Sequence, residues 1–575
     1  MEEGIVRVSD VTYRYPKGEE PALRGVNLEV KRGEVLAIMG PTGAGKTTLV
    51  SLFNGLIPHY FEGRVTGEVL VSDLSTSRHR IQDLVEHVGL VLQDPETQIF
   101  GITVLEDTAF GPSNLGYPRE QILNLVREAL AAVRLSGYEE RLTANLSGGE
   151  KQRLAIAGVL AMQPEILVLD EPTSELDPLG RAEVFEAVSA LRAERQATVI
   201  LVEHETEDVL RLADKVAVIA KGEIVWYGAP RDLFRDVLKT RDLSIRPPEV
   251  AELGLKLCER GLLPTDEIPL TLEEAEAVIR EMLGGKKLEA QAQTLSSPGT
   301  VERTTIIETI DLTHVYPGGI QAVSGVNLKI RKGEFIALVG QNGAGKTTLV
   351  KHFNGLLTPT SGAVMVNGVD TRELGIGELA KQVGYVFQNP DHQIFSTTVE
   401  EEIRYGLKNL GLSEDEQEMR IREALSLVGL EDKRGRHPFT LSKGERQKVA
   451  VASILAIAPP VIIIDEPTTG LDWTGTTRML ELISALHRRG HTVIMITHNM
   501  RIVANYAERV IVMSEGKILL DGSPSQVFEH AQELQRSYLE PPQMTLLAQR
   551  LADLGCPKGI VTVDQMVEVI ANALR

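Results

Sequence analysis

The strongest constraint on the fold of this chain is a long internal repeat in its sequence. "GPTGAGKTTLV" at 40–50 returns as "GQNGAGKTTLV" at 340–350, and "ILVLDEPTSELD" returns as "VIIIDEPTTGLD". Gly40 and Gly340 lie 300 residues apart, whereas Asp170 and Asp465 lie 295 apart, so the first half holds five extra residues, around "IPHYFEGRV". A repeat of this length predicts two similar domains in series.

The repeat extends to a small appendix behind each large domain. "IRPPEVAELGLKLCERGL" from Ile245 resembles "LEPPQMTLLAQRLADLG" from Leu539, and a short helical pattern follows each. The stretch "GGKKLEAQAQTLSSPGTVER" between the halves has the composition of a flexible linker. We therefore expect domains at 1–236 and 305–530, helical appendices at 237–283 and 531–575, and a linker at 284–304.

Within each half, short apolar runs alternate with helical patterns. "EVLAIMG", "EILVLDE" and "ATVILVEH" have the length and the β-branched content of buried strands. This alternation predicts an α/β fold with mainly parallel sheets.

Composition excludes several classes of protein. The net charge of −20 over 575 residues disfavours a protein whose main partner is nucleic acid or anionic lipid. No run reaches the ~18 apolar residues that a membrane helix needs, and the acidic start "MEEGIVRV" does not read as a signal peptide. Cys258 and Cys556 lack ligand-like spacing, so we expect reduced thiols.

A glycine-rich loop follows an apolar strand in each half. Gly40 to Thr47 and Gly340 to Thr347 both match G-x-x-x-x-G-K-[ST]. Such a loop turns backbone N–H groups toward phosphates, and the following helix adds its positive end. We expect Lys46 and Lys346 to reach the β- and γ-phosphates of a nucleotide, and Thr47 and Thr347 to bind Mg²⁺.

Two adjacent carboxylates end a second apolar strand in each half. These are Asp170 with Glu171, and Asp465 with Glu466. An apolar strand has little reason to end in two negative charges unless a metal or a reaction uses them. The aspartates suit Mg²⁺ and the glutamates suit polarisation of an attacking water; the alternative is that one acid only caps the turn before the following proline.

Taken in order, these motifs resemble the ATP-binding-cassette (ABC) ATPases over nearly all of both halves. The resemblance implies two P-loop NTPase domains, each with a helical subdomain, that hydrolyse ATP with Mg²⁺. It implies catalytic roles for six residues: Glu171, Glu466, His204, His498, Gln93 and Gln388. The implied metal-binding residues are Thr47, Gln93, Asp170, Thr347, Gln388 and Asp465. The implied nucleotide-binding residues are Tyr15, Gly40, Pro41, Thr42, Gly43, Ala44, Gly45, Lys46, Thr47, Thr48, Ser147, Gly149, Tyr316, Gly340, Gln341, Asn342, Gly343, Ala344, Gly345, Lys346, Thr347, Thr348, Ser442 and Gly444.

The resemblance also explains the phrases "LSGGE" at 146–150 and "LSKGE" at 441–445. In this family two cassettes meet head to tail, so each phrase would close the nucleotide site of the other half, with Asp177 and Asp472 in loops that touch across the pair. Lys443 stands where the first half has Gly148. It either makes the two sites unequal, or points to solvent and leaves the ATP contacts to Ser442 and Gly444. Glu175 is a second departure, in place of the small residue usual before "LD".

Within the family, the chain most resembles the ATPases of energy-coupling-factor (ECF) importers. The shared features are "DPETQIF" and "NPDHQIF" after the glutamines, "EDTAFGPSNLG" and "EEIRYGLKNLG", and the appendix with "PP". The resemblance implies a transmembrane scaffold subunit, a membrane substrate-binding subunit, and a peripheral location on the cytoplasmic face of the cell membrane. Gln98, Phe100, Gln393 and Phe395 would line a groove for the scaffold, unless the aromatic residues are ordinary core.

Two other functions stay open at this stage. A fused-cassette sugar importer is one, although that group usually has one degraded nucleotide site and both loops are intact here. A soluble ribosome-associated tandem factor is the other. Its arm between cassettes is basic, whereas 241–303 holds 8 Lys or Arg against 12 Asp or Glu. The substrate, a vitamin, vitamin precursor or metal ion by resemblance, is not encoded in the chain.

Overall fold

The computed structural model describes residues 4–16, 18, 20–173, 176, 178–195, 197–288 and 303–574. The chain forms two compact units, Met1–Glu252 (unit 1) and Leu253–Arg575 (unit 2). Among the residues described, no helix is long and apolar enough to cross a membrane.

Unit 1 contains two sheets. Its six-stranded sheet has the order β10-β9-β3-β8-β7-β6 and is parallel except for β10. A four-stranded sheet, β2-β1-β4-β5, is antiparallel. The strands are β1 (Val6–Arg14), β2 (Leu23–Val30), β3 (Val35–Met39), β4 (Arg64–Val71), β5 (Leu74–Ser75), β6 (Val88–Val91), β7 (Ile166–Asp170), β8 (Thr198–Val202), β9 (Lys215–Ala220) and β10 (Glu223–Gly228).

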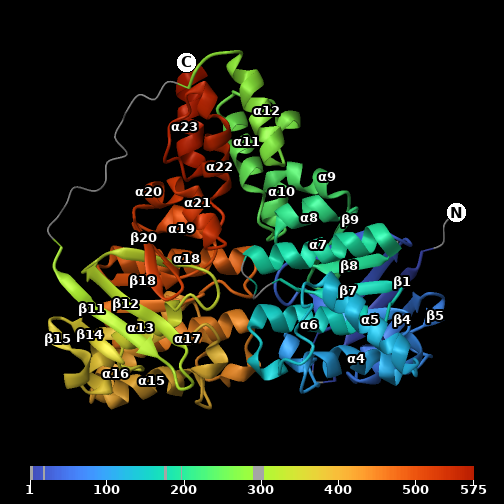
Figure 1. Cartoon of the computed structure of the whole chain (residues 1–575), viewed down its shortest axis with the longest axis horizontal. Coiled ribbons are helices and arrows are strands. Elements are labelled where there is room, and N and C mark those ends of the chain that lie inside the picture. The colour runs from blue at the N-terminus through green and yellow to red at the C-terminus, as the bar shows by residue number, and fades with distance from the viewer. Residues whose placement is uncertain are drawn as a thin grey trace. The chain divides into compact units, whose positions relative to one another are not determined.

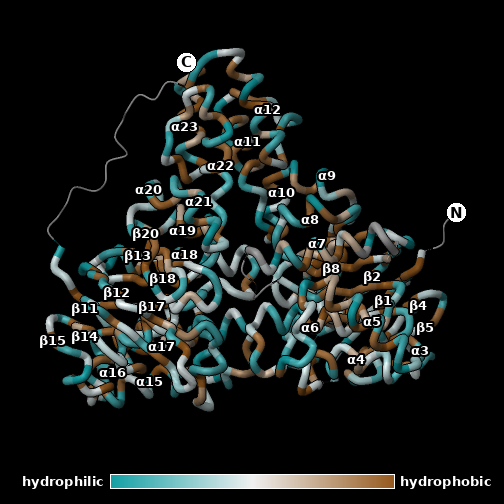
Figure 2. Tube along the Cα trace, in the orientation of Figure 1, coloured by the Kyte–Doolittle hydropathy of each residue, from teal (hydrophilic) through white to brown (hydrophobic). Residues whose placement is uncertain are grey.

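The central strands of unit 1 are buried along their whole length. β3, β7 and β8 are buried at every position, as expected for parallel strands covered on both faces. Brown stretches of the tube mark such hydrophobic strands in Figure 2. The helices of the unit are α1 (Lys46–Phe53), α2 (Leu56–His59), α3 (Ile81–Leu84), α4 (Val104–Asn114), α5 (Arg119–Ala132), α6 (Gly148–Leu160), α7 (Pro178–Arg195), α8 (Thr206–Leu212), α9 (Pro230–Arg235) and α10 (Val237–Asp242).

Unit 2 repeats this architecture. Its six-stranded sheet is β16-β17-β18-β13-β19-β20 and its four-stranded sheet is β12-β11-β14-β15. The strands are β11 (Thr305–Val315), β12 (Gln321–Arg331), β13 (Phe335–Val339), β14 (Ser361–Val366), β15 (Val369–Asp370), β16 (Val383–Val386), β17 (Val461–Asp465), β18 (Thr492–Ile496), β19 (Arg509–Ser514) and β20 (Lys517–Gly522). The helices are α13 (Lys346–Phe353), α14 (Ile376–Gln382), α15 (Val399–Asn409), α16 (Glu414–Val428), α17 (Lys443–Ile457), α18 (Trp473–Arg488), α19 (Met500–Tyr506), α20 (Pro524–Glu529), α21 (Ala531–Arg536), α22 (Gln543–Arg550) and α23 (Val563–Leu574).

Most of the first appendix packs with the second appendix, inside unit 2. The boundary between the units falls within α11 (Glu249–Glu259), and α12 (Leu272–Leu283) contacts α22 and α23 (Figure 1). Arg280 forms a bidentate ion pair with Asp553 at 2.8 and 2.9 Å, and Lys256 pairs with Asp564 at 2.5 Å. Most of the predicted linker, 289–302, lies outside the described residues.

Candidate functional site

The glycine-rich loop of each unit joins a buried strand to a helix. β3 leads through the loop into α1, and β13 leads into α13. Lys46 is 6% exposed, and its Nζ donates to the carbonyl oxygens of Gly40 and Pro41 at 2.9 and 3.1 Å. Lys346 makes the same contacts with Gly340 and Gln341 at 2.7 and 2.8 Å. Both lysines are therefore held over the loop that precedes them.

Gly40 shows why this loop needs glycine. Its φ of +137° is in the region that favours glycine, and a Cβ there would lie 2.0 Å from the carbonyl oxygen of Ile219. Gly340 repeats this, with Met513 O at 2.3 Å. Next to the loop, the Tyr15 hydroxyl lies 3.1 Å from that of Thr48, and Tyr316 has the same contact with Thr348. Each predicted adenine-stacking tyrosine is thus fixed to the helix that follows the loop.

The strand-end carboxylate pair of unit 1 meets the predicted histidine and glutamine. The Glu171 N–H donates to Val202 O at 3.0 Å, and Glu171 adopts a φ of +50°. Its Oε1 lies 2.9 Å from His204 Nε2, and its Oε2 accepts a hydrogen bond from Gln93 Nε2 at 2.8 Å. The structure therefore brings these three predicted catalytic residues together.

Asp170 lies behind Glu171 and is nearly inaccessible, at 2% exposure. Burial raises the pKa of Asp170 to about 6, although a hydrogen bond from Thr47 and the charge of Lys46 act in the other direction. Its Oδ1 is buried and has no hydrogen-bond partner among the described residues. An unpaired buried carboxylate oxygen next to a threonine hydroxyl fits the donor set that Mg²⁺ prefers.

Unit 2 builds a similar site with one added group. Glu466 Oε1 lies 3.0 Å from His498 Nδ1, and Asp465 Oδ2 accepts a hydrogen bond from Thr347 Oγ1 at 3.0 Å. Tyr385 Oη also donates to Asp465 Oδ2, at 2.7 Å. The first half has Leu90 at this strand position, so its aspartate lacks that hydroxyl. Gln388 is exposed where the chain leaves β16.

The two phrases that begin with Leu-Ser start helices. Ser147 caps α6 and Ser442 caps α17, each in a capping box with the glutamate three residues on. Lys443 does not extend freely into solvent, because its side chain is half-buried against Gly470. Its Nζ lies 3.1 Å from the point where a Cβ would stand if residue 470 had a side chain. Gly148 and Glu175 occupy the corresponding positions in the first half. Glu175 and Asp177 lie outside the described residues.

The stretches that follow Gln93 and Gln388 contain exposed aromatic residues. Phe100 is 70% and Phe395 63% exposed, so neither is core. The ring of Phe100 lies tilted against that of Phe110, which is also exposed, with 5.7 Å between the ring centroids. Phe395 packs edge-on against Tyr405 at 4.8 Å.

Gln98 and Gln393 hold these stretches in place. Gln98 accepts from Leu92 N and donates to Leu90 O, while Gln393 accepts from Phe387 N and donates to Ala450 O. The two glutamines therefore fix the backbone that presents the aromatic residues.

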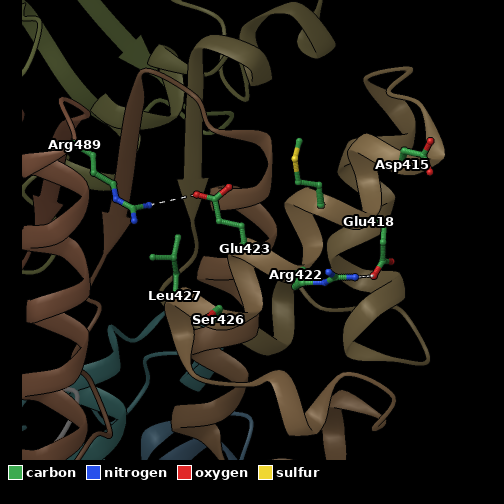
Figure 3. Close-up of a pocket in the computed structure, with 8 residues that line it drawn as sticks. Asp415, Glu418, Arg422, Glu423, Ser426, Leu427 and Arg489 are labelled. Atoms are coloured by element: carbon green, nitrogen blue, oxygen red, sulfur yellow. Dashed lines mark hydrogen bonds and ion pairs between the residues drawn. The ribbon is translucent and has the colours of Figure 1, made fainter.

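A separate hollow of about 580 Å³ lies on the helical part of unit 2 (Figure 3). Its charges are largely matched, because Arg422 pairs with Glu418 at 3.4 Å and Arg489 pairs with Glu423 at 3.7 Å. The groups that suit phosphate chemistry are those at the strand ends, outside the lining of this hollow.

The comparisons with known proteins cover both units. The model of the ABC transporter family matches residues 23–174 and 323–469, which cover both glycine-rich loops and both strand-end carboxylate pairs. The chain belongs to the ABC transporter family. It is a two-cassette ABC ATPase, and the predicted fold of two P-loop NTPase domains is confirmed.

Relatives match the ABC ATPase along its whole length. One from Caldanaerobacter subterraneus subsp. tengcongensis, described as an ABC transporter ATP-binding protein, is 44% identical over 97% of this chain and 98% of its own. Another so described, from Methanosarcina mazei, is 41% identical over 98% and 97%. The structure of CbiO1 from Clostridium perfringens, part of the ABC transporter complex CbiONQ, is 38% identical. It covers 40% of this chain and 93% of its own, with a TM-score of 0.37.

The sequence motifs do not include the groups that surround His204. Glu203 is 3% exposed; its carboxylate accepts hydrogen bonds from Thr173 Oγ1 and from His204 N, the latter at 2.9 Å. Burial raises its pKa to about 7. An alignment of the two halves shows Glu203 as a difference between them, because the second half has Thr497 at the matching position before its histidine.

We expect Glu203→Gln to change how stability depends on pH. The unfolded carboxyl loses its proton near pH 4.5, whereas the folded one keeps it up to about pH 7, so the wild type loses stability as the pH rises through this window. Glutamine keeps an acceptor without the charge. The variant should gain up to ~3 kcal/mol over the wild type at pH 8 and little at pH 5.

Thermal unfolding between pH 5 and 8 would measure this effect. The exposed acid Glu140, changed to glutamine, serves as the matched control and should leave the pH dependence unchanged. An equal shift of Glu203→Gln at pH 5 and pH 8 would contradict the assignment.

Proposed function

We propose that the chain is the ATP-hydrolysing energy-coupling subunit of a membrane importer of the ECF type. The observation that supports ATP hydrolysis best is the carboxylate–histidine contact present in both cassettes, Glu171 with His204 and Glu466 with His498. Two intact carboxylate–histidine pairs are consistent with an ATPase in which both nucleotide sites hydrolyse ATP.

Each proposed role follows from the position of the residue. Lys46 and Lys346 sit over their loops, where they can exchange carbonyl contacts for the β- and γ-phosphates. Glu171 and Glu466 orient the attacking water and accept its proton, while the histidines hold the γ-phosphate. Tyr15 and Tyr316 stack on adenine from the edge of each loop.

Mg²⁺ neutralises charge between the β- and γ-phosphates when it is bound. In the first cassette Thr47, Asp170 and Gln93 would hold it, and the unpaired Oδ1 of Asp170 supports this. Thr347, Asp465 and Gln388 would do so in the second. By family resemblance, the ATP-bound cassettes pair head to tail, with Ser147 and Gly149 closing the site of Lys346. Ser442 and Gly444 would close the site of Lys46.

The exposed aromatic pairs support a partner in the membrane. Phe100 with Phe110, and Phe395 with Tyr405, present large apolar side chains to solvent at equivalent places in the two cassettes. Exposed aromatic pairs are typical anchors of protein interfaces. We propose that they receive a transmembrane scaffold subunit, which places the chain on the cytoplasmic face of the membrane. A separate membrane subunit binds the vitamin, vitamin precursor or metal ion.

We expect Glu171→Gln and Glu466→Gln each to lower ATP turnover at least about tenfold, equivalent to more than ~1.4 kcal/mol of barrier. Glutamine keeps the size of the side chain but cannot accept the proton from water. Steady-state phosphate release by the assembled transporter would measure the loss. A near-normal rate in either variant would contradict two working sites.

We expect a tagged chain, purified from its own cells in mild detergent, to bring with it one polytopic membrane protein and a small membrane-bound substrate binder. The double variant Phe100→Ser/Phe395→Ser should lose both, because the apolar anchors are gone. The exposed Ile376, changed to serine, is the control and should retain them. Ribosomes in the eluate, or no membrane protein with the wild type, would overturn the importer.

A further inference from the structure

A partly buried ion network joins the loop that carries His204 to the segment of the first appendix that precedes α11. Arg246 lies three residues before α11, and its Nη2 donates to Glu205 Oε2 at 2.5 Å and to Glu207 Oε2 at 2.9 Å. Glu205 directly follows His204 and occupies the N-cap position of α8, although its side chain makes no capping hydrogen bond there. A single guanidinium therefore connects the first appendix segment to the turn that aims the histidine.

The network is held from other sides as well. Arg181 of α7 lies 3.7 Å from Glu205 and 3.4 Å from Asp208. The Arg246 side chain is only 15% exposed. Burial disfavours its charge, yet the carboxylates of Glu205 and Glu207 raise the pKa of Arg246 above its ordinary value. A partly buried charge held by several partners helps to fix geometry, because moving any member leaves another less compensated.

His204 is anchored on both sides along the chain. Glu203, before it, accepts hydrogen bonds from Thr173, two residues after Glu171, and from the N–H of His204 itself. Glu205, after it, is held by Arg246. Between the two anchors, His204 Nε2 lies 2.9 Å from Glu171 Oε1. The approach of the imidazole to the catalytic carboxylate thus depends on neighbours at both ends.

The second cassette uses a different device at this place. Asn499 follows His498, and its side chain caps α19 by accepting from Ile502 N at 3.2 Å. In the matching appendix segment, "LEPPQM" against "IRPPEV", Glu540 stands where Arg246 does, and it is exposed. The anchor to the appendix segment is therefore a feature of the first cassette, which the second replaces by a local helix cap.

We infer that Arg246 is a positioning residue for His204 that acts through Glu205, so that the first appendix segment influences turnover at the first cassette. This rests on the proposed role of His204 in ATP hydrolysis. Without Arg246, Glu205 and Glu207 face each other with less compensating charge, and the turn that carries His204 opens away from Glu171.

The test compares Arg246→Gln, Glu205→Gln and the double variant in the assembled transporter. Each single variant should lower kcat at least about fivefold with little change in KM for ATP, because orientation and not binding is lost. The double variant should lose much less than the product of the two single losses, since both single variants remove the contact between Arg246 and Glu205. Arg246→Lys, which keeps the charge, should recover part of the rate. Glu540→Gln in the second cassette is the matched control and should leave kcat unchanged.

Three results would overturn the inference: a normal kcat for Arg246→Gln, a double-variant loss equal to the product of the single losses, or no recovery by lysine in a folded protein. His204→Ala separates this failure from failure of the proposed function. A normal rate for His204→Ala would sink the role of the histidine itself. A slow His204→Ala beside a normal Arg246→Gln would sink only the positioning role.

Discussion

The site in each unit depends on burying a short apolar strand that ends in two carboxylates. β7 and β17 are buried at all five positions, including Asp170 and Asp465. Burial costs the aspartates free energy in their charged form, which raises their pKa. This burial follows from the parallel pairing, which brings the carboxyl ends of β7 and β8 to one edge of the sheet. There Glu171, His204 and the glycine-rich loop can meet one nucleotide.

The two halves share this frame and differ around it. Tyr385 donates a hydrogen bond to Asp465, whereas Oδ1 of Asp170 has no hydrogen-bond partner among the residues that the structure describes. Glu203 and Arg246 anchor the first histidine loop, whereas Thr497 and Asn499 shape the second with local hydrogen bonds. Lys443 covers Gly470 in unit 2. One chain thus carries two candidate sites with the same proposed reacting groups and different neighbouring contacts, which a dimer of identical chains could not do.

The candidate reacting groups could be located in the sequence, because each motif is local. A glycine-rich loop and a carboxylate pair at a strand end can each be recognised within a few residues. The fold class follows from the alternation of short apolar runs with helical patterns. Contacts between segments that lie far apart in the sequence could not be predicted in this way. The side chain of Lys443 depends on the space above Gly470, and the first appendix packs with the second although about 270 residues separate Arg280 from Asp553. Neither has a local pattern to reveal it. Tyr385 and Glu203 were accessible in principle, as departures between the two copies.

The most direct test of the account is the number of ATP molecules that one chain holds when hydrolysis is blocked. The double variant Glu171→Gln/Glu466→Gln keeps both glycine-rich loops, both aspartates and both tyrosines that we propose to stack on adenine. Equilibrium binding of labelled ATP with Mg²⁺ to the assembled transporter should saturate at two molecules per chain. Saturation at one would show that the sequence repeat preserved the motifs in both halves but a working nucleotide site in only one.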